Sequence, residues 1–514
     1  MASPMIATSS RLPLILLLGL GACARQGLSV PASPAAKATV TATPEEPKNG
    51  ELLQGSVVAV LSEGQAYDFT SPWAKQRPWS RRMTGLVVEG NRILVAGGLL
   101  ANSTLIEVQK KGEPQRYPAK VVIADYELPL TLLEVQDPRF FADLSPLPIA
   151  AELPEGGAVA ISRWLGSGQF ETAEGNIRQV VVQDHFPGRT PILSLDVSSA
   201  IESNGASDVV IAEDQVVGLC TAKSESQLRV MGGPVLRQFL ERAAQKSYAG
   251  FARHAFGWQS LTNAALRRHL GVPEGQGGLL IRKVLPKSSG AGVLETGDVL
   301  LELGGYPIDE SGKFDHPRYG KLFFSVLFTD GRAPGDPLPA VVLRNKQKKT
   351  LEIPLRRMDP DQDVVPPYIN DRAPEHLVLG GLVFQTLSKP YLETWREWWK
   401  NAPLRMLVAF DQVGPFPPEG QARIVVLSRV LPDPVNLGYQ DLEPMIITAI
   451  NGRPATDLTA VAAAWRDPVG GFQVIDTLPG QSTSRIVLDA QAAAEADPRI
   501  RTLYGITPGA KRRP

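Results

Sequence analysis

Between Gly55 and Val235 the sequence consists of short apolar runs separated by turn-forming residues, and no window with helical periodicity appears before Val235–Ala244. Short strands at close spacing are typical of an antiparallel barrel or sandwich. We therefore expect such a fold over residues 51–245, ending in one helix. The expected strands are Ser56–Leu61, Met83–Val88, Arg92–Ala96, Leu105–Val108, Ala119–Ala124, Leu130–Val135, Ala158–Ser162, Ile177–Val182, Val209–Ile211 and Gln215–Cys220.

A second patterned stretch extends from Gly277 to Pro307. Two short apolar runs, Leu279–Leu285 and Val299–Leu303, are bounded by Gly, Pro and Ser, so each predicts a buried strand. The small residues of Ser288–Leu294, which lies between the runs, suit a single helical turn.

The glycines that open this stretch suggest a binding function. A glycine-rich loop ahead of a strand leaves consecutive backbone N–H groups free to receive a carboxylate, and an exposed strand edge accepts a peptide as an added strand. We expect capture of a peptide end or an extended segment, with a plain hairpin turn as the alternative. The expected peptide-binding residues are Gly277, Gly278, Leu279, Leu280 and Ile281.

The sequence GAGVLETGDVLLELGGYPI resembles the PDZ domain family, because its Gly297-Asp298 and Gly304-Gly305 turns fall where that family places them. The resemblance implies a first PDZ module over residues 250–358. Val284-Leu285-Pro286 then recurs as Val430-Leu431-Pro432.

Val299–Pro307 also recurs, as Met445–Pro454 with one residue inserted. Such self-similarity predicts two copies of one fold. We expect the second PDZ-like module over 376–514, after a Pro- and Asp-rich linker at 359–375. Its capacity to bind a ligand stays open, because Glu443-Pro444 replaces the Gly-Asp turn.

An aromatic stretch begins the second module. Leu392, Trp395 and Trp399 fall on one face of a predicted helix. We expect these side chains to cover the core of their own module, and a docking surface for another part or subunit is the alternative.

The order of segments in residues 51–245 resembles the trypsin-like domain of Deg (HtrA) serine proteases, and 376–510 resembles the second PDZ domain of plant-type two-PDZ Deg proteases. The resemblance implies a mainly β chain: a trypsin-like double β-barrel followed by two PDZ-like α+β modules. It places Gly98 at the general base, Glu127 at the orienting acid and Ala206 at the nucleophile. A shift of one residue would place Ser207 at the nucleophile instead.

These residues predict a degenerate catalytic triad. A serine attacks a peptide carbonyl at neutral pH only with an adjacent base, and Gly98 has no side chain that accepts a proton. Ala206 has no oxygen. The five histidines begin at His185 and lack metal-ligand spacing, so we expect no catalytic residue, no metal and no cofactor.

Residues 1–22 have the charged start and short apolar core of a secretory signal. Leu20-Gly21-Ala22-Cys23 resembles the bacterial lipobox, which implies lipidation of Cys23, and Ala24 resembles the sorting pattern for the outer membrane, facing the periplasm. The alternative is an ordinary signal peptide. We expect residues 23–50 to form a flexible tether.

Cys220 lies within an apolar run, so we expect it to be a buried structural thiol.

The formal net charge is zero, which gives no indication of nucleic acid as a partner. We expect a membrane-anchored Deg/HtrA-like pseudoprotease that binds peptides or unfolded segments in protein quality control of the cell envelope. An active serine endopeptidase and a purely structural docking scaffold are the alternatives. Family resemblance also implies a possible homo-oligomer.

Overall fold

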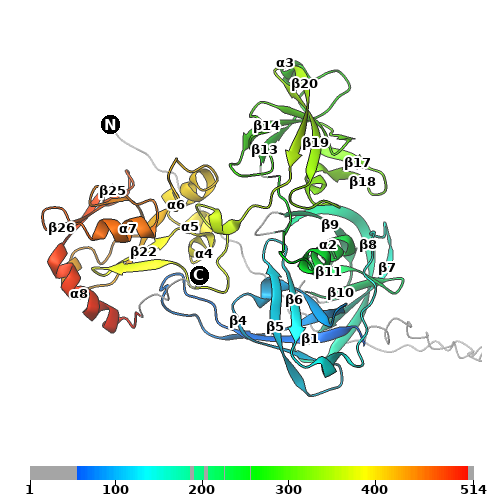
Figure 1. Cartoon of the computed structure of the whole chain (residues 1–514), viewed down its shortest axis with the longest axis horizontal. Helices are drawn as coiled ribbons and strands as arrows, with labels where there is room; N and C mark the ends of the chain where they lie inside the picture. The colour runs from blue at the N-terminus through cyan, green and yellow to red at the C-terminus, as the bar shows by residue number, and fades with distance from the viewer. Residues whose placement is uncertain (1–54, 186–189, 202–206, 225, 255, 507–514) are drawn as a thin grey trace, which may run out of the picture. The chain divides into compact units, whose positions relative to one another are not determined.

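The computed structural model describes residues 55–185, 190–201, 207–224, 226–254 and 256–506 (Figure 1). Cys23 and Ala206 lie outside these ranges. Within them, no helix is both long and apolar enough to cross a membrane.

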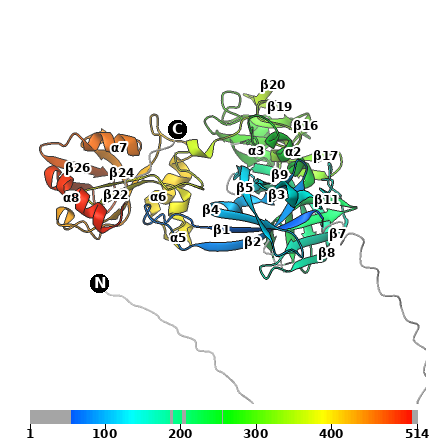
Figure 2. The same ribbon diagram turned by 60° about the horizontal axis from the view of Figure 1, so that its bottom comes forward.

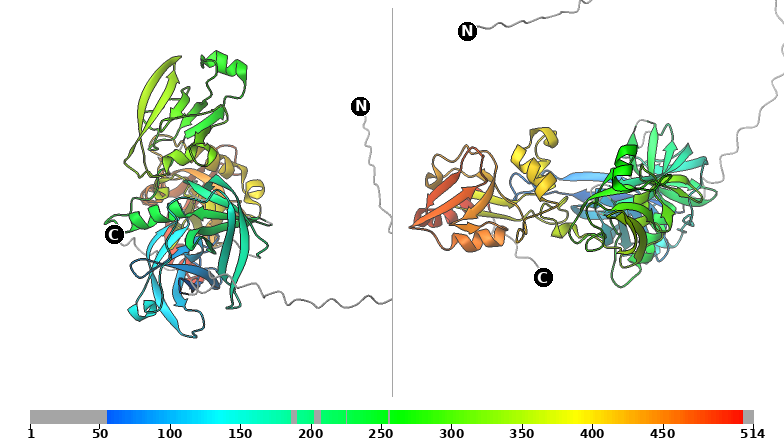
Figure 3. Two further views of the ribbon diagram at one scale, coloured as in Figure 1. Left: turned by 90° about the vertical axis from the view of Figure 1, so that its right-hand side faces the viewer. Right: turned by 90° about the horizontal axis from the view of Figure 1, so that it is seen from above.

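The first part of the described chain forms two closed barrels, each of six antiparallel strands. They are coloured blue to cyan and teal to green in Figure 3. The strand orders are β1-β2-β3-β6-β5-β4 and β10-β11-β12-β9-β8-β7. The strands are β1 (Val57–Gly64), β2 (Trp79–Val88), β3 (Arg92–Ala96), β4 (Ser103–Gln109), β5 (Arg116–Asp125), β6 (Leu130–Val135), β7 (Gly157–Trp164), β8 (Phe170–His185), β9 (Thr190–Ser198), β10 (Val209–Ala212), β11 (Gln215–Ser224) and β12 (Gln227–Gly232).

All ten expected strands are present, so the predicted mainly β fold with a double barrel is confirmed. Strands β9 and β12 were not predicted from the sequence. Polar residues interrupt the apolar pattern of β9, although the strand is buried along almost its whole length. Its Asp196 forms an ion pair with Arg229 at 2.7 Å and accepts a hydrogen bond from Gln179 at 2.9 Å. Burial of polar groups is tolerated where they are paired.

A single helix, α2 (Gly233–Ala243), follows the barrels and confirms the predicted helix at their end. Its Val235, Leu236 and Phe239 are buried against the strands. Pro234 lies in the first turn, where its missing N–H costs no helical hydrogen bond.

The first PDZ-like module is built on a sheet with the order β13-β14-β15-β19-β20, and β16 pairs with β15. A separate hairpin, β17-β18, precedes the short helix η3. The elements are β13 (Phe256–Ser260), α3 (Ala264–Leu270), β14 (Leu279–Val284), β15 (Val299–Leu303), β16 (Tyr306–Pro307), β17 (Lys313–His316), β18 (Gly320–Phe323), η3 (Phe324–Phe328), β19 (Pro337–Arg344) and β20 (Gln347–Pro354). Residues 288–294 form turns and not the expected helical turn.

The second module has the strand order β21-β22-β23-β24-β26-β27, and β25 pairs with β24. Helices α7 and α8 pack against this sheet (Figure 2). The elements are β21 (His376–Leu379), β22 (Leu382–Thr386), α4 (Lys389–Leu392), α5 (Trp398–Asn401), α6 (Leu404–Val408), η5 (Ala409–Val413), β23 (Val425–Val430), η6 (Pro434–Asn436), β24 (Met445–Ile450), β25 (Arg453–Pro454), α7 (Leu458–Trp465), β26 (Phe472–Thr477), β27 (Arg485–Asp489) and α8 (Ala490–Leu503). Three other short helices are η1 (Gly97–Leu100), η2 (Pro138–Phe141) and η4 (Pro360–Gln362).

The two modules repeat the same pairing, which confirms the predicted repeat. In the first module, the pairing of β13 with β14 has a register shift after Gly257. In the second module, the pairing of β22 with β23 has a register shift at the corresponding position, after Val383. Strand β15 pairs with β16 through Glu302 and Pro307, and β24 pairs with β25 through Ala449 and Pro454. Val299–Pro307 therefore corresponds to residues 446–454 without the expected insertion.

The predicted helix through Leu392, Trp395 and Trp399 is wrong as a continuous element. It is interrupted before α5, where Glu397 has a left-handed backbone with φ of 49°. Leu392 is fully buried in the core of its own module, whereas Trp399 is 60% exposed. The face therefore divides between a core residue and a surface residue.

Candidate functional site

The position expected for a general base lies in η1, directly after β3. Gly98 is exposed, and a β-carbon on Gly98 would lie 3.7 Å from Cβ of Pro129. Pro129, in the turn between β5 and β6, therefore faces Gly98. Neither residue has a group that accepts or donates a side-chain proton.

The position expected for the orienting acid is buried. Glu127 is 4% exposed, accepts a hydrogen bond from Tyr368 Oη at 3.0 Å and lies 3.7 Å from Arg253 in an ion pair. Burial raises the pKa of Glu127 to about 6, while Arg253 and the hydrogen bond from Tyr368 oppose the rise. Tyr368 lies in the linker, and Arg253 lies in the segment ahead of β13. The carboxyl group of Glu127 is therefore paired with a tyrosine and an arginine, whereas an orienting acid is paired with a histidine.

The alternative nucleophile, Ser207, is fully buried and has a left-handed backbone with φ of 63°. Its hydroxyl donates to the carbonyl of Thr84 at 2.6 Å and accepts from the backbone N–H of Ala96 at 3.0 Å. These partners belong to the first barrel, whereas Ser207 precedes a strand of the second. The hydroxyl therefore links the two barrels instead of facing solvent.

The thiol of Cys220 lies in the interior of the second barrel and is fully buried. Burial, followed by the nearby charge of Asp208, raises the pKa of Cys220 well above its ordinary value. The reactive form of cysteine is the thiolate. Cys220 is thus a structural residue, as predicted.

The predicted peptide-binding strand is wrong. Leu279 and Leu280 pair with β13 on one side and with β15 on the other, so β14 has no free edge along these residues. The side chains of Leu279 and Ile281 are fully buried in the core. An incoming strand would have to displace a paired neighbour to reach β14.

The two glycines of the expected carboxylate loop lie close to other parts of the backbone. A β-carbon on Gly277 would lie 2.5 Å from the backbone nitrogen of Glu310, and one on Gly278 would lie 2.9 Å from the carbonyl oxygen of Leu300. The absence of a side chain at both positions permits close backbone packing. Both glycines are therefore explained by close packing against the backbone of Leu300 and Glu310.

The edge of the first sheet is β13, which pairs with β14 alone among the described strands. Along β13, Phe256 is buried, Gly257 and Gln259 are exposed, and Trp258 is partly buried. The ring of Trp258 lies 5.3 Å from that of Phe323, beside η3. The alternation of apolar and polar residues in Phe256–Ser260 is the signal from which this strand could have been predicted.

The second module has an additional strand at the corresponding edge. Strand β22 is the counterpart of β13, and β21 pairs antiparallel with it. Leu377 and Leu379 of β21 pack against the core of the second module. The chain itself thus fills the edge position that is open on β13.

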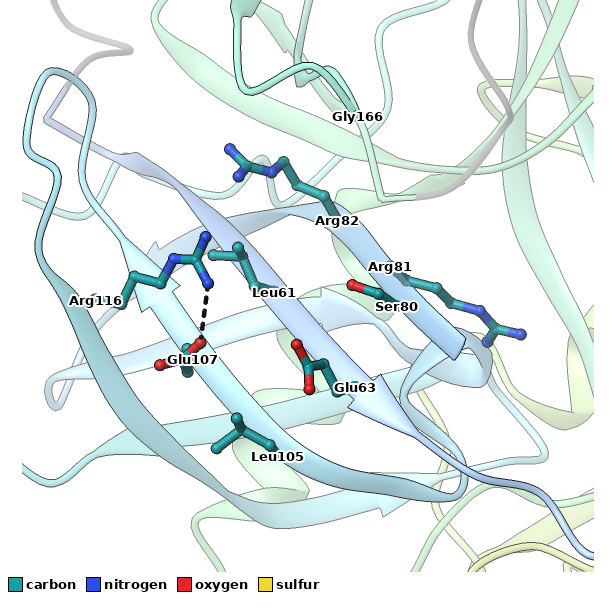
Figure 4. Close-up of a pocket in the computed structure, with 9 residues that line it drawn as sticks. All are labelled: Leu61, Glu63, Ser80, Arg81, Arg82, Leu105, Glu107, Arg116 and Gly166. Atoms are coloured by element: carbon teal, nitrogen blue, oxygen red, sulfur yellow. Dashed lines mark hydrogen bonds and ion pairs between the residues drawn. The ribbon is translucent and has the colours of Figure 1, made fainter. Parts of the chain in front are cut away.

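A separate pocket of about 310 Å³ lies on the outside of the first barrel (Figure 4). Arg116 forms an ion pair with Glu107 at 3.4 Å, and burial, followed by the charge of Arg116, lowers the pKa of Arg82. Glu63 also lines the pocket, so the pocket has both basic and acidic side chains.

Over the described ranges, no group of three His, Cys, Asp or Glu side chains could hold a metal ion.

Two closed antiparallel barrels followed by two repeated sheets define a trypsin-fold protein with PDZ-like modules. A PDZ domain model matches residues 365–510. The chain is 26% identical over 417 residues to the Arabidopsis thaliana protein named protease Do-like 2, chloroplastic, covering 79% of this chain and 67% of the relative.

A second Arabidopsis thaliana protein, named putative protease Do-like 3, mitochondrial, is 24% identical over 408 residues, with 78% of this chain and 70% of the relative covered. A solved structure described as HtrA-type protease AlgW with decapeptide aligns with a TM-score of 0.47 at 15% identity, covering 61% of this chain and all of the other. The chain is a homologue of Deg/HtrA-family proteases and contains a PDZ domain.

Proposed function

We propose that this chain is a membrane-anchored pseudoprotease that binds peptides or unfolded protein segments by adding them as a strand to β13 of the first PDZ-like module. The observation that carries the proposal is the open edge of β13, because its counterpart in the second module is covered by β21. Strand addition supplies main-chain hydrogen bonds that depend little on the sequence of the ligand. This property suits a protein that holds many different unfolded segments.

The pairing of β21 with β22 provides a template for the register in which a ligand would pair with β13. Val378 is opposite Val383, and Leu379 is opposite Leu382. Transferred to the first module, the same register would place ligand residues opposite Gly257 and Phe256. An extended ligand with apolar residues at alternate positions, like Leu377 and Leu379, would pack over Trp258 and the adjoining rings.

The proposed lack of proteolysis rests on Gly98 and on the environment of Ser207. A base is needed to activate a serine, and Gly98 supplies none. Ser207 already makes two buried hydrogen bonds, to Thr84 and Ala96, so using it as a nucleophile would require these bonds to break.

Anchoring is proposed from the lipobox-like sequence that ends at Cys23. Acyl chains on this residue would hold the protein at the cell envelope, on the periplasmic side of the outer membrane. The ligands would then be peptides or unfolded proteins of the envelope, and the proposed role would be protein quality control without cleavage.

The purified chain of residues 24–514 is expected not to hydrolyse an unfolded casein substrate above the rate in buffer, because the base position is Gly98. Release of fluorescent peptides over time measures this activity. Turnover that a serine-directed covalent inhibitor abolishes, with the label located on a serine by mass spectrometry, would contradict the proposal and establish an active endopeptidase.

A synthetic peptide with the sequence of residues 374–381, PEHLVLGG, is expected to bind the same chain through β13. Two versions methylated on alternate backbone nitrogens should differ in affinity by about tenfold or more, because each hydrogen bond contributes roughly 1 kcal/mol and only one set of alternate N–H groups faces the sheet. Isothermal titration calorimetry measures both affinities. Equal affinities for the two methylated peptides would rule out strand addition.

The anchor has its own test in cells. Replacement of Cys23 by Ser removes the thiol that lipidation requires, so the protein should move from the membrane fraction to the soluble fraction. Fractionation followed by immunoblotting measures the distribution. A Cys23→Ser protein that is processed and retained in the membrane as before would overturn the anchor assignment while leaving the peptide-binding proposal intact.

A further inference from the structure

The linker between the two PDZ-like modules contacts the first barrel beside the degenerate centre. We define the docking face as Asn102, Tyr126 and Glu127, and the linker motif as Tyr368–Asp371, with the sequence Tyr-Ile-Asn-Asp. Asn102 follows η1, which carries Gly98, and Glu127 lies two residues before Pro129. The docking face therefore flanks the former triad positions on both sides.

The aspartate of the linker motif is held by several polar contacts. The backbone N–H of Asn102 donates to Oδ1 of Asp371 at 2.6 Å, and the backbone N–H of Asp371 donates to Oδ1 of Asn102 at 3.0 Å. Tyr126 Oη also donates to Oδ2 of Asp371. Reciprocal backbone and side-chain bonds fix both the position and the orientation of a residue, because each partner is donor and acceptor at once.

Tyr368 of the linker motif makes a second contact with the docking face. Its hydroxyl donates to Glu127 at 3.0 Å, and its ring lies 6.0 Å from that of Tyr126 in an edge-to-face arrangement. Glu127 is also paired with Arg253. A hydrogen bond to a charged, buried carboxylate is stronger than one between neutral groups.

We infer that the docking face is a binding site for an extended Tyr-x-x-Asp segment, and that the chain's own linker motif occupies it. Glu127, at the position of the orienting acid, serves here as the acceptor for the ligand's tyrosine. The inference goes beyond the proposed peptide binding at β13 and does not depend on it. Its ligand class is also different, because it is defined by one hydroxyl and one carboxylate three residues apart.

The covalent connection explains how a small set of contacts keeps the site filled. Intramolecular binding proceeds at an effective concentration that depends on the length and stiffness of the connection, and a free peptide has no such advantage. A free peptide of the same motif would therefore compete poorly with the native linker. Removal of the linker's own side chains would open the site.

The test uses the chain of residues 24–514 carrying both Tyr368→Ala and Asp371→Ala. The acetylated and amidated probe peptide PPYINDR has the sequence of residues 366–372. Fluorescence anisotropy of the labelled peptide should show binding at least about tenfold tighter to this double variant than to the parent chain. Control peptides with Phe in place of Tyr, or Asn in place of Asp, should each lose most of that gain. No gain on the double variant, or equal binding of the control peptides, would overturn the inference.

A second measurement covers the case in which the double variant does not fold. Tyr126→Phe keeps the ring that lies beside Tyr368 and removes the hydroxyl that donates to Oδ2 of Asp371. Trypsin should then cleave after Arg372 at least about tenfold faster than in the parent, because the lost hydrogen bond to a carboxylate releases the linker motif from the face. The control is Thr104→Ala, which removes a hydroxyl that donates to the backbone carbonyl of Glu63. Unchanged cleavage in Tyr126→Phe, or equally accelerated cleavage in the control, would contradict the inference.

Discussion

The pairing of strand edges governs how this protein is built and what its parts are available to do. An unpaired edge presents N–H and C=O groups that favour another strand. Closure removes the edges of the two barrels, and β21 covers the edge of β22 in the second module. In the described part of the first module, β13 has no such cover. The same sheet therefore occurs twice in the chain. In the second module β21 pairs with the edge of β22, whereas in the first module the edge of β13 is open.

Two of the residues considered as members of a catalytic triad, Glu127 and Ser207, have buried structural partners. A trypsin-like fold brings segments from both barrels together, and here Ser207 makes one of the contacts between them, through a hydroxyl bonded to Thr84 and Ala96. Glu127 is likewise retained as a buried polar group, with Tyr368 and Arg253 as partners. The polar groups of Ser207 and Glu127 thus have structural partners, which supports the proposed loss of catalysis.

Much of the fold was predictable from the sequence, since short apolar runs and a repeated Val-Leu-Pro pattern depend on local residues alone. The open sheet edge at β13 was not predictable. Strand β14 is central in the sheet and has a continuous apolar run. Strand β13 contains Gly257 and Gln259, which interrupt its apolar residues, so no strand was predicted there. The contacts of Glu127 were also beyond sequence reasoning, because Tyr368 lies 241 residues away and no local pattern couples the two.

Hydrogen–deuterium exchange of residues 24–514, with and without the peptide PEHLVLGG, tests the central claim that ligands join the edge of β13. The account predicts slower exchange of alternate backbone amides within Phe256–Ser260 when the peptide is bound. Amides of Leu279–Ile281 should be unchanged, because β14 is already paired on both sides. Peptide-induced protection at β14, or saturating binding without any protection at β13, would contradict the account.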